Sequence, residues 1–293
     1  MTSLSGNAEG SKRYIELFLL LAASVALWWQ AIVSTLQLAF ANDAYTHILL
    51  ILPLSVALMY FERRQRTMPG ASGRRVGAIV LAIALVVLGL TAWNLGHLSS
   101  DWRLSVGMLA LVFWWIGSLI LCFGFTVVRT FLFPLCFLFL IVPLPENFID
   151  VATVFLQRQS ALASEILFRV AHVPVTRAGI MLSIPALDIE VARECSSIRS
   201  STMLIVITLI LAHLFLRSWW RKVLLVVVAI PLSVAKNAVR IFTIAELGTR
   251  VDPGYLNGRL HHNGGVIFLG FALVVDVGLL LILRRGESIP EIR

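Results

Sequence analysis

The sequence predicts an all-α polytopic membrane protein with about eight transmembrane helices. Of its 293 residues, 59% are hydrophobic and only 14% are charged, whereas soluble domains are about half apolar and a quarter charged. The mean hydropathy is +0.90, and apolar runs of roughly 20 residues, the length that crosses a bilayer, recur along the chain. Since so little polar surface is available, lipid must be the solvent for most of the protein.

The candidate spans are separated by short segments that contain charged residues, glycine or proline. They cover Tyr14–Ile32, Tyr45–Phe61, Val76–Trp93, Leu104–Cys122, Phe125–Leu144, Ser196–Leu216, Val223–Leu247 and Gly264–Leu283. Lys12 and Arg13 precede the first run, and no small-residue cleavage site follows it. We therefore expect a retained span there rather than a cleaved signal peptide.

Basic residues predict the orientation, because short cytoplasmic loops are enriched in lysine and arginine. If eight spans alternate, one side receives Lys12, Arg13, Arg63, Arg64, Arg66, Arg74, Arg75, Arg129, Arg217, Arg221, Lys222, Arg284, Arg285 and Arg293. Both termini are therefore expected in the cytoplasm. The net charge of +8 is scattered between apolar runs, so it does not indicate a nucleic-acid partner.

A different kind of segment, residues 145–194, lies between the fifth and sixth spans. Glu146–Val170 is amphipathic and predicts one or two helices at the membrane interface or packed on the bundle. Residues 174–191 have β-branched residues, near-alternation and Pro/Gly punctuation, which predict short strands or a hairpin. We expect this segment outside the cytoplasm, within one integral-membrane domain of residues 1–293 whose last helices, 195–283, carry the site.

Of the three cysteines, only Cys195 lies in a polar segment. Cys122 and Cys136 lie in apolar runs, where a thiol is usually an inert small hydrophobe. No Cys-x-x-Cys or Cys/His spacing indicates a metal, and we expect no organic cofactor.

Polar residues from the last three spans are expected at the same depth. Cys195 begins the sixth span, and His261 and His262 begin the eighth. Arg240 lies roughly 27 Å beyond Lys222 along the seventh helix, close to the outer interface. Whether the three groups share one site does not follow from these positions.

Such a trio suits acyl transfer. A thiolate at a helix N-terminus is a strong nucleophile, an imidazole moves its proton, and a guanidinium stabilises an oxyanion. The structural alternatives are an Arg240 that snorkels or pairs with Glu246, and a buried ion pair between Lys236 and Asp276. Arg199, one turn after Cys195, either lines the site or caps nearby carboxylates.

Three motifs resemble those of the exosortase and archaeosortase family. The stretch Glu190–Ser200 (EVARECSSIRS) resembles the motif of the catalytic cysteine, Asn237–Ile241 (NAVRI) that of the essential arginine, and Leu260–Gly265 (LHHNGG) that of the histidine. Weaker matches are Tyr45-Thr46-His47 with Leu52-Pro53-Leu54, and Val142–Glu146. The resemblance extends over about Tyr45 to Leu283. Serine at 197 and isoleucine at 48 replace residues that are usually glycine in the family, which affects substrate fit rather than reactive groups.

The resemblance implies a membrane-embedded cysteine protease and transpeptidase of the bacterial inner membrane, with its active site facing the periplasm. Its substrates would be membrane-anchored exported proteins with a C-terminal sorting signal: a Pro-Glu-Pro motif, one transmembrane helix and a basic tail. It implies Cys195 as the nucleophile, Arg240 as the transition-state stabiliser and His261 as the acid/base. His261 is favoured over His262 because it precedes Gly265 by four. The product would pass through a thioester to an acceptor linked with extracellular polysaccharide.

Two other hypotheses come from different classes. A transporter would use Arg240, Lys236 and Asp276 to bind a ligand, but the inverted repeats typical of transporters are not evident. A non-enzymatic subunit of a polysaccharide-export system would not depend on these polar residues at all.

Overall fold

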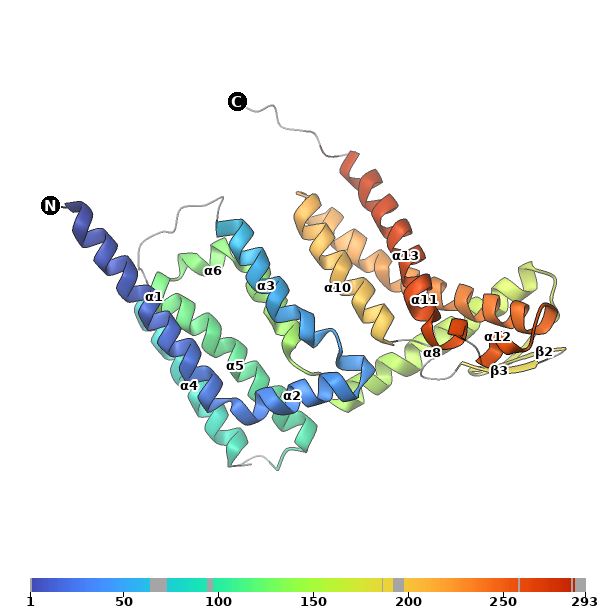
Figure 1. The fold of residues 1–293 in the computed structure, drawn as a ribbon, viewed down its shortest axis with the longest axis horizontal. Coiled ribbons are helices and arrows are strands. Elements are labelled where there is room, and N and C mark those ends of the chain that lie inside the picture. The colour runs from blue at the N-terminus through green and yellow to red at the C-terminus, as the bar shows by residue number, and fades with distance from the viewer. Residues whose placement is uncertain are drawn as a thin grey trace. The chain divides into compact units, whose positions relative to one another are not determined.

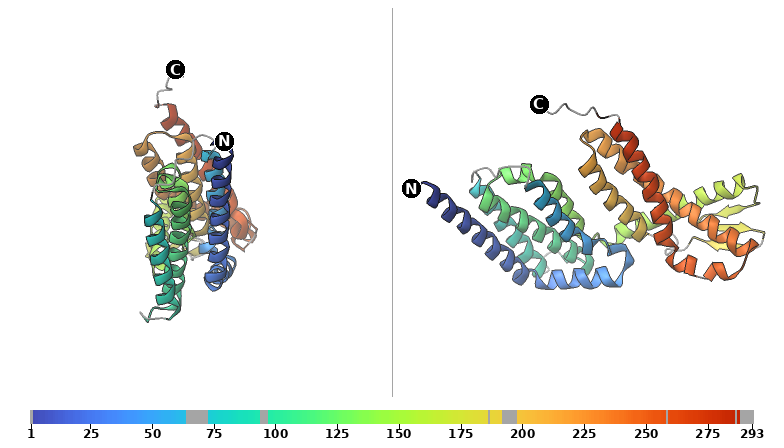
Figure 2. Two further views of the ribbon diagram at one scale, coloured as in Figure 1. Left: turned by 90° about the vertical axis from the view of Figure 1, so that its left-hand side faces the viewer. Right: turned by 45° about the horizontal axis from the view of Figure 1, so that its top comes forward.

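The computed structural model describes residues 2–63, 73–93, 97–185, 187–191, 198–257, 259–285 and 287, with side chains except at 2–10, 257 and 259–264. By its internal contacts the chain divides into two compact units, Met1–Glu146 and Asn147–Arg293, each described separately below (Figures 1 and 2). Compactness does not test whether residues 1–293 form one functional domain, so that expectation stays a prediction.

Helices make up nearly all of the first unit. They are α1 (Thr2–Leu27), α2 (Trp29–Ala41), η1 (Asp43–Tyr45), α3 (Ile48–Arg63), α4 (Arg74–Ala92), α5 (Ser100–Phe123), α6 (Thr126–Thr130), α7 (Leu132–Phe137) and η2 (Leu138–Ile141). In the second unit, long helices flank a small sheet. Its elements are α8 (Glu146–Val170), β1 (Thr176–Ala178), β2 (Met181–Ile184), β3 (Leu187–Glu190), α10 (Ile198–Phe215), α11 (Trp219–Arg250), α12 (Gly254–Asn257) and α13 (Arg259–Arg285).

The predicted fold class is confirmed. Among the described residues, six helices are long and apolar enough to cross a membrane, and up to eight spans result if each of two bent helix pairs counts as one. The protein is therefore a multi-pass, all-α membrane protein with one small sheet.

The first predicted span, Tyr14–Ile32, is not straight. Helices α1 and α2 meet at Trp28 with a bend of 71°. No proline or glycine causes this bend; the Trp28 side chain is 1% exposed and its Nε1 donates to the Gly107 carbonyl oxygen of α5 at 2.9 Å. A tertiary contact thus accompanies a helix bend that the local sequence does not predict.

The fifth predicted span, Phe125–Leu144, was wrong as a single helix. The segment forms α6, α7 and η2 instead, with breaks at Phe131 and after Ile141. Residues 132–141 rise only about 15 Å even as a continuous helix, too little to cross a bilayer alone. Pro143 and Pro145, which lack an N–H group, follow this segment and oppose its continuation.

The secondary structure predicted for residues 145–194 is confirmed where the structure describes it, while the expected location outside the cytoplasm stays a prediction. The amphipathic stretch is one helix, α8, with the predicted bounds and a buried face that includes Gln157, Ala161, Ser164 and Phe168. The strands form an antiparallel sheet in the order β1-β2-β3. Arg177 of β1 donates from Nε to Glu165 of α8 at 2.6 Å, which ties the sheet to the helix.

Close packing in the first unit depends on glycine. A Cβ atom added at Gly77 of α4 would lie 2.6 Å from the Leu121 backbone nitrogen of α5. Tryptophan indoles join α1 to α5, since Trp114 Nε1 donates to the Leu20 carbonyl oxygen at 2.9 Å and Trp115 Nε1 to Ser24 Oγ at 3.0 Å. The interior of this unit is therefore held by small residues and neutral hydrogen bonds, while the ion pair between Arg74 of α4 and Glu16 of α1, at 3.1 Å, lies at its surface.

The second unit has two packing regions along α11. Helices α10, α11 and α13 pack against one another around Ala212, Leu225 and Leu280, and Figure 1 shows them side by side. Beyond this three-helix region, residues of α8, the sheet and α11 share a second core, which includes Phe168, Leu182, Val191, Ile241 and Ala245.

Candidate active site

Arg240 lies in a buried polar stripe of α11. Ser233, Lys236, Asn237 and Arg240 are 1%, 6%, 0% and 5% exposed. The spacing i, i+3, i+4, i+7 places these side chains on one face of the helix. Charged side chains are almost never fully buried without partners, and ionisable residues within a span are expensive and usually functional. The stripe therefore marks this face of α11 as the candidate site.

The first turns of α10 join this stripe. The Lys236 ammonium donates a buried hydrogen bond to Ser200 Oγ. Ser200 lies five residues after Cys195 in sequence and in the first turn of α10. The described residues that follow Cys195 are thus attached to α11 one turn before Arg240.

The residues that precede Cys195 are anchored beside Arg240 as well. Val191 is fully buried, and its N–H group donates to the Ile180 carbonyl oxygen at 3.0 Å. Its own carbonyl oxygen accepts from Gln157 Nε2 of α8 at 2.9 Å. Val191 shares a core with Ile241, the residue after Arg240. Cys195 itself lies outside the described residues, but Val191 and Ser200, on either side of it, both lie against α11.

The start of α13, where both candidate histidines lie, is placed by a tight corner. Helix α12 packs between the end of α11 and α13, and a Cβ atom at Gly248 of α11 would lie 2.4 Å from Leu256 Cδ2. His261 and His262 belong to the first turn of α13. The structure does not describe the side chains of these two histidines, so the choice between them stays a prediction. The convergence of the Cys195 sulfur, a histidine imidazole and the Arg240 guanidinium also stays a prediction.

Other expectations for the polar residues are corrected. Lys236 and Asp276 form no ion pair with each other: Lys236 donates to Ser200, and Asp276 Oδ2 accepts from Thr208 Oγ1 at 3.0 Å. Each of the two side chains contacts a hydroxyl group on α10, the helix that precedes both α11 and α13 in the chain. Glu246, the suggested partner of Arg240, pairs with Arg250 at 2.8 Å instead. Arg199 is exposed in the first turn of α10, and whether it lines the site or caps nearby carboxylates stays a prediction.

Sequence reasoning missed Ser200 and Asn237 as members of this cluster. Asn237 is completely buried on the same face of α11 as Lys236 and Arg240. The signal was present, because polar residues recur at helical spacing through an otherwise apolar run. Among the described residues, no three His, Cys, Asp or Glu side chains gather as metal ligands.

Two ion pairs share the carboxylate of Glu165 on α8, and one of them reaches the sheet. Glu165 accepts from Arg177 and from Arg169, each at 2.6 Å. The hydrogen bond from Arg177 is the main reason why the pKa of Glu165 is lowered from its usual value. The carboxylate therefore stays charged at neutral pH and links the C-terminal half of α8 to β1.

These features define a multi-pass helical membrane protein with buried charges in its C-terminal unit. The comparison with protein families gives the class: the chain belongs to the family described as transmembrane exosortase, whose model matches residues 28–278. Members of this family are membrane proteins of the protein-sorting protease and transpeptidase class. No curated protein and no solved structure gave a match.

Proposed function

We propose that the protein is a cysteine transpeptidase and protease that cleaves C-terminal sorting signals of membrane-anchored exported proteins. The observation that carries the proposal is the buried Arg240, which lies beside the two described segments, ending at Val191 and beginning at Ile198, that bracket Cys195. The family match and the three motifs give the expected roles of the residues.

In the proposed reaction, the Cys195 sulfur attacks the carbonyl carbon of the scissile peptide bond. Arg240 stabilises the oxyanion, which a guanidinium can do without ever losing its charge. His261 takes the thiol proton and returns it to the leaving amine as the C–N bond breaks. Water or an acceptor nucleophile then attacks the thioester, and the thiol is regenerated.

Cysteine replacement tests the nucleophile. A membrane-anchored reporter with a Pro-Glu-Pro motif, one apolar helix and a basic tail should be processed by the wild-type protein and not by Cys195→Ala. The matched control is Cys136→Ala, which removes an exposed free thiol elsewhere in the chain and should leave processing intact. Mass spectrometry should find the covalent reporter adduct on Cys195. Normal processing by Cys195→Ala would remove this residue from the mechanism.

The two histidines are separated by a parallel pair of variants. His261→Ala should abolish processing, while His262→Ala should retain most of it, because His261 has the spacing to Gly265 that the family motif favours. The reverse result would assign the acid/base role to His262 and leave the rest of the proposal intact.

The proposal also places both termini in the cytoplasm of a bacterial inner membrane and the site at the periplasmic face. A membrane-impermeant thiol reagent should label Asn257→Cys in intact cells. It should not label Glu62→Cys, near the end of α3. Labelling of only Glu62→Cys would show that the topology is the reverse of the proposed one, and it would exclude an exported substrate.

The transporter hypothesis requires Arg240, Lys236 and Asp276 to bind one ligand together. Lys236 and Asp276 each have a separate hydroxyl partner on α10, so the geometry does not favour that hypothesis. A purified protein that forms no adduct but moves a solute across a vesicle membrane would restore it.

A further inference from the structure

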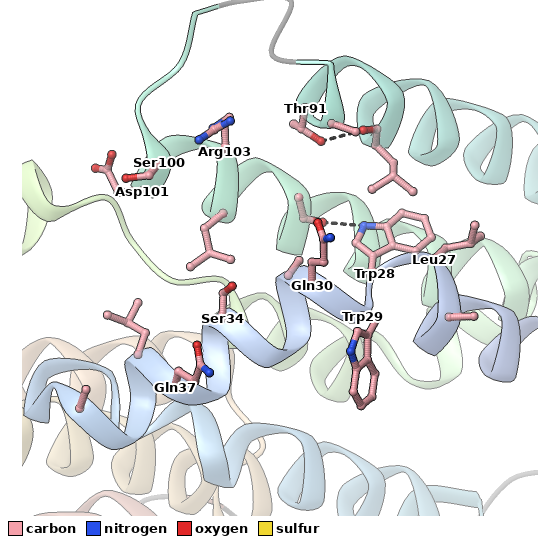
Figure 3. Close-up of a pocket in the computed structure, with 18 residues that line it drawn as sticks. Leu27, Trp28, Trp29, Gln30, Ser34, Gln37, Thr91, Ser100, Asp101 and Arg103 are labelled. Atoms are coloured by element: carbon pink, nitrogen blue, oxygen red, sulfur yellow. Dashed lines mark hydrogen bonds between the residues drawn. The ribbon is translucent and has the colours of Figure 1, made fainter.

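The first unit contains a large pocket that the proposed chemistry does not use. It has a volume of about 1110 Å³ and lies among the end of α1, α2, the end of α4 and the start of α5 (Figure 3). The proposed topology puts these helix ends at one face of the membrane, and therefore puts the pocket at the depth of lipid headgroups rather than at the bilayer centre. Trp29, which is 59% exposed, lies at the pocket and is of the residue type that anchors proteins at this depth.

One wall of the pocket carries a cation, Arg103, that has no partner among the residues that the structure describes. Arg103 lines the pocket from the first turn of α5, and its Nε is buried without a hydrogen-bond partner. Among the described residues, its guanidinium forms no hydrogen bond or ion pair. A buried donor without an acceptor is unfavourable, and a guanidinium fits the oxygens of a phosphate group.

The same turn carries a carboxylate that does not pair with Arg103. Asp101 accepts hydrogen bonds from the Ser99 hydroxyl group and from the Glu146 N–H group, the latter at 3.3 Å. A carboxylate has about four acceptor positions, so it can also accept from a ligand. One wall of the pocket therefore offers a separate positive and negative group, which complements a ligand that carries both charges.

The opposite wall combines neutral polar groups with apolar surface. Gln30, Ser34 and Gln37 recur at i, i+4 and i+7 along α2, and Figure 3 shows them on the side that faces α5. Leu88, Ala92 and Leu104 supply apolar surface next to the charged turn. A headgroup with hydrogen-bonding atoms and an attached hydrocarbon chain matches this lining.

We propose that this pocket binds a zwitterionic glycerophospholipid of the ethanolamine type. Arg103 binds the phosphate, Asp101 accepts from the primary ammonium, and the start of an acyl chain lies along Leu88 and Leu104. The site is separate from the proposed catalytic residues, and this assignment does not depend on them.

Lipid binding to the purified, delipidated full-length protein tests the assignment by native mass spectrometry. The probes are phosphatidylethanolamine, phosphatidylglycerol and phosphatidylcholine with identical acyl chains. The first dissociation constant for phosphatidylethanolamine should be lowest, because glycerol has no ammonium and choline has no N–H donor. Arg103→Gln should raise this constant about 10-fold, as expected for a lost hydrogen bond to a charged group.

The controls separate this site from general attraction to charge. Arg250→Gln removes one positive charge from an exposed arginine that pairs with Glu246, and it should not change lipid binding. Asp101→Asn should remove the preference for phosphatidylethanolamine over phosphatidylglycerol, and Arg103→Lys should retain binding if Arg103→Gln fails to fold. Equal constants for the three lipids in the wild type, an unchanged constant in Arg103→Gln, or displacement of lipid by inorganic phosphate would overturn the assignment.

Discussion

The two compact units bury different kinds of polar side chains. Among the described residues, the polar side chains of the first unit that are buried as a whole carry only hydroxyl groups, as in Ser24 and Ser118, apart from the indole and phenol of aromatic residues. Arg103 buries its Nε but is partly exposed. The second unit buries Lys236, Arg240 and Asp276 as well as two side-chain amides. Polar groups in both units are shielded from water. In the first unit these are mainly hydroxyl groups, and in the second they also include charged and amide groups.

The difference indicates which unit buries costly charged groups that a functional site would explain. A buried serine or threonine can donate to the carbonyl oxygen four residues earlier, as Ser118 does to Trp114 at 2.8 Å. A buried lysine or arginine has more donors than its own helix can satisfy. Natural proteins keep such groups inside membrane spans mainly where a site requires them. We therefore propose that the first unit is a support and that the second unit carries the reactive groups.

The largest effect is expected from Arg240→Lys. The substitution keeps the charge but replaces a planar, five-donor fork with a point charge. Processing of the reporter should fall by at least about 100-fold, the loss typical of a missing oxyanion donor, while the thermal transition of the purified protein stays within a few degrees. Arg250→Lys, at an exposed ion pair of the same helix, is the control. Comparable activity in the two variants would show that the second unit does not need the buried guanidinium for processing.

A substitution in the first unit should act on stability instead. Gly77→Ala forces a Cβ atom against the Leu121 backbone, and overpacking of this kind costs about 1–3 kcal/mol. Gly89→Ala is the matched control in the same helix, because no other atom lies within 4 Å of its added Cβ. Denaturation in mixed micelles should show a lower stability for the first variant only, with unchanged processing per folded molecule. A loss of specific activity in Gly77→Ala would give this unit a direct role.

Two neighbouring serines of the second unit, Ser200 and Ser201, test whether the hydrogen bond to Lys236 contributes to stability. Ser200→Ala removes the acceptor of a buried ammonium and should lower stability by about 1–2 kcal/mol. Ser201 is also buried, but its Oγ has no hydrogen-bond partner, so Ser201→Ala should change stability by less than about 0.5 kcal/mol. The same denaturation assay measures both. An equal loss of stability in the two variants would mean that the hydrogen bond from Lys236 to Ser200 does not stabilise the folded protein.

The smallest effect concerns Glu287, at the end of the chain. Its carboxylate accepts from the backbone N–H groups of Ser218, at 2.8 Å, and Arg217, at 3.0 Å, just before α11. The Ser218 bond is the main reason that the pKa of Glu287 is lowered. A lowered pKa stabilises the folded state above the unfolded value of about 4.3, and this contribution is lost as the pH falls through the folded pKa.

Glu287→Gln should therefore melt slightly below the wild type at pH 7, and the difference should shrink as the pH falls below about 4.3 and vanish below the folded pKa. Differential scanning fluorimetry at several pH values measures this. Glu165 provides a comparison, since the pKa of that carboxyl group is also lowered, but by arginine side chains rather than by backbone groups. A difference that grows as the pH falls would contradict the capping role of Glu287.

Much of the architecture was determined by the sequence alone, because hydrophobic run length and periodicity report directly on a helix in lipid. The bounds of α8, the strands before Val191 and most spans followed from local patterns. The same patterns placed Arg240 within a span and so marked it as a candidate. These features depend on residues that are near neighbours in the chain.

The bend at Trp28, the broken segment at 125–144, and the partners of Lys236 and Asp276 could not be predicted from local patterns. Each depends on a contact between distant residues, such as the Trp28 indole with the Gly107 carbonyl group or Lys236 with Ser200. A buried charge must find a partner, but its own sequence neighbourhood does not say which one. That choice is made by whichever helix packs beside it.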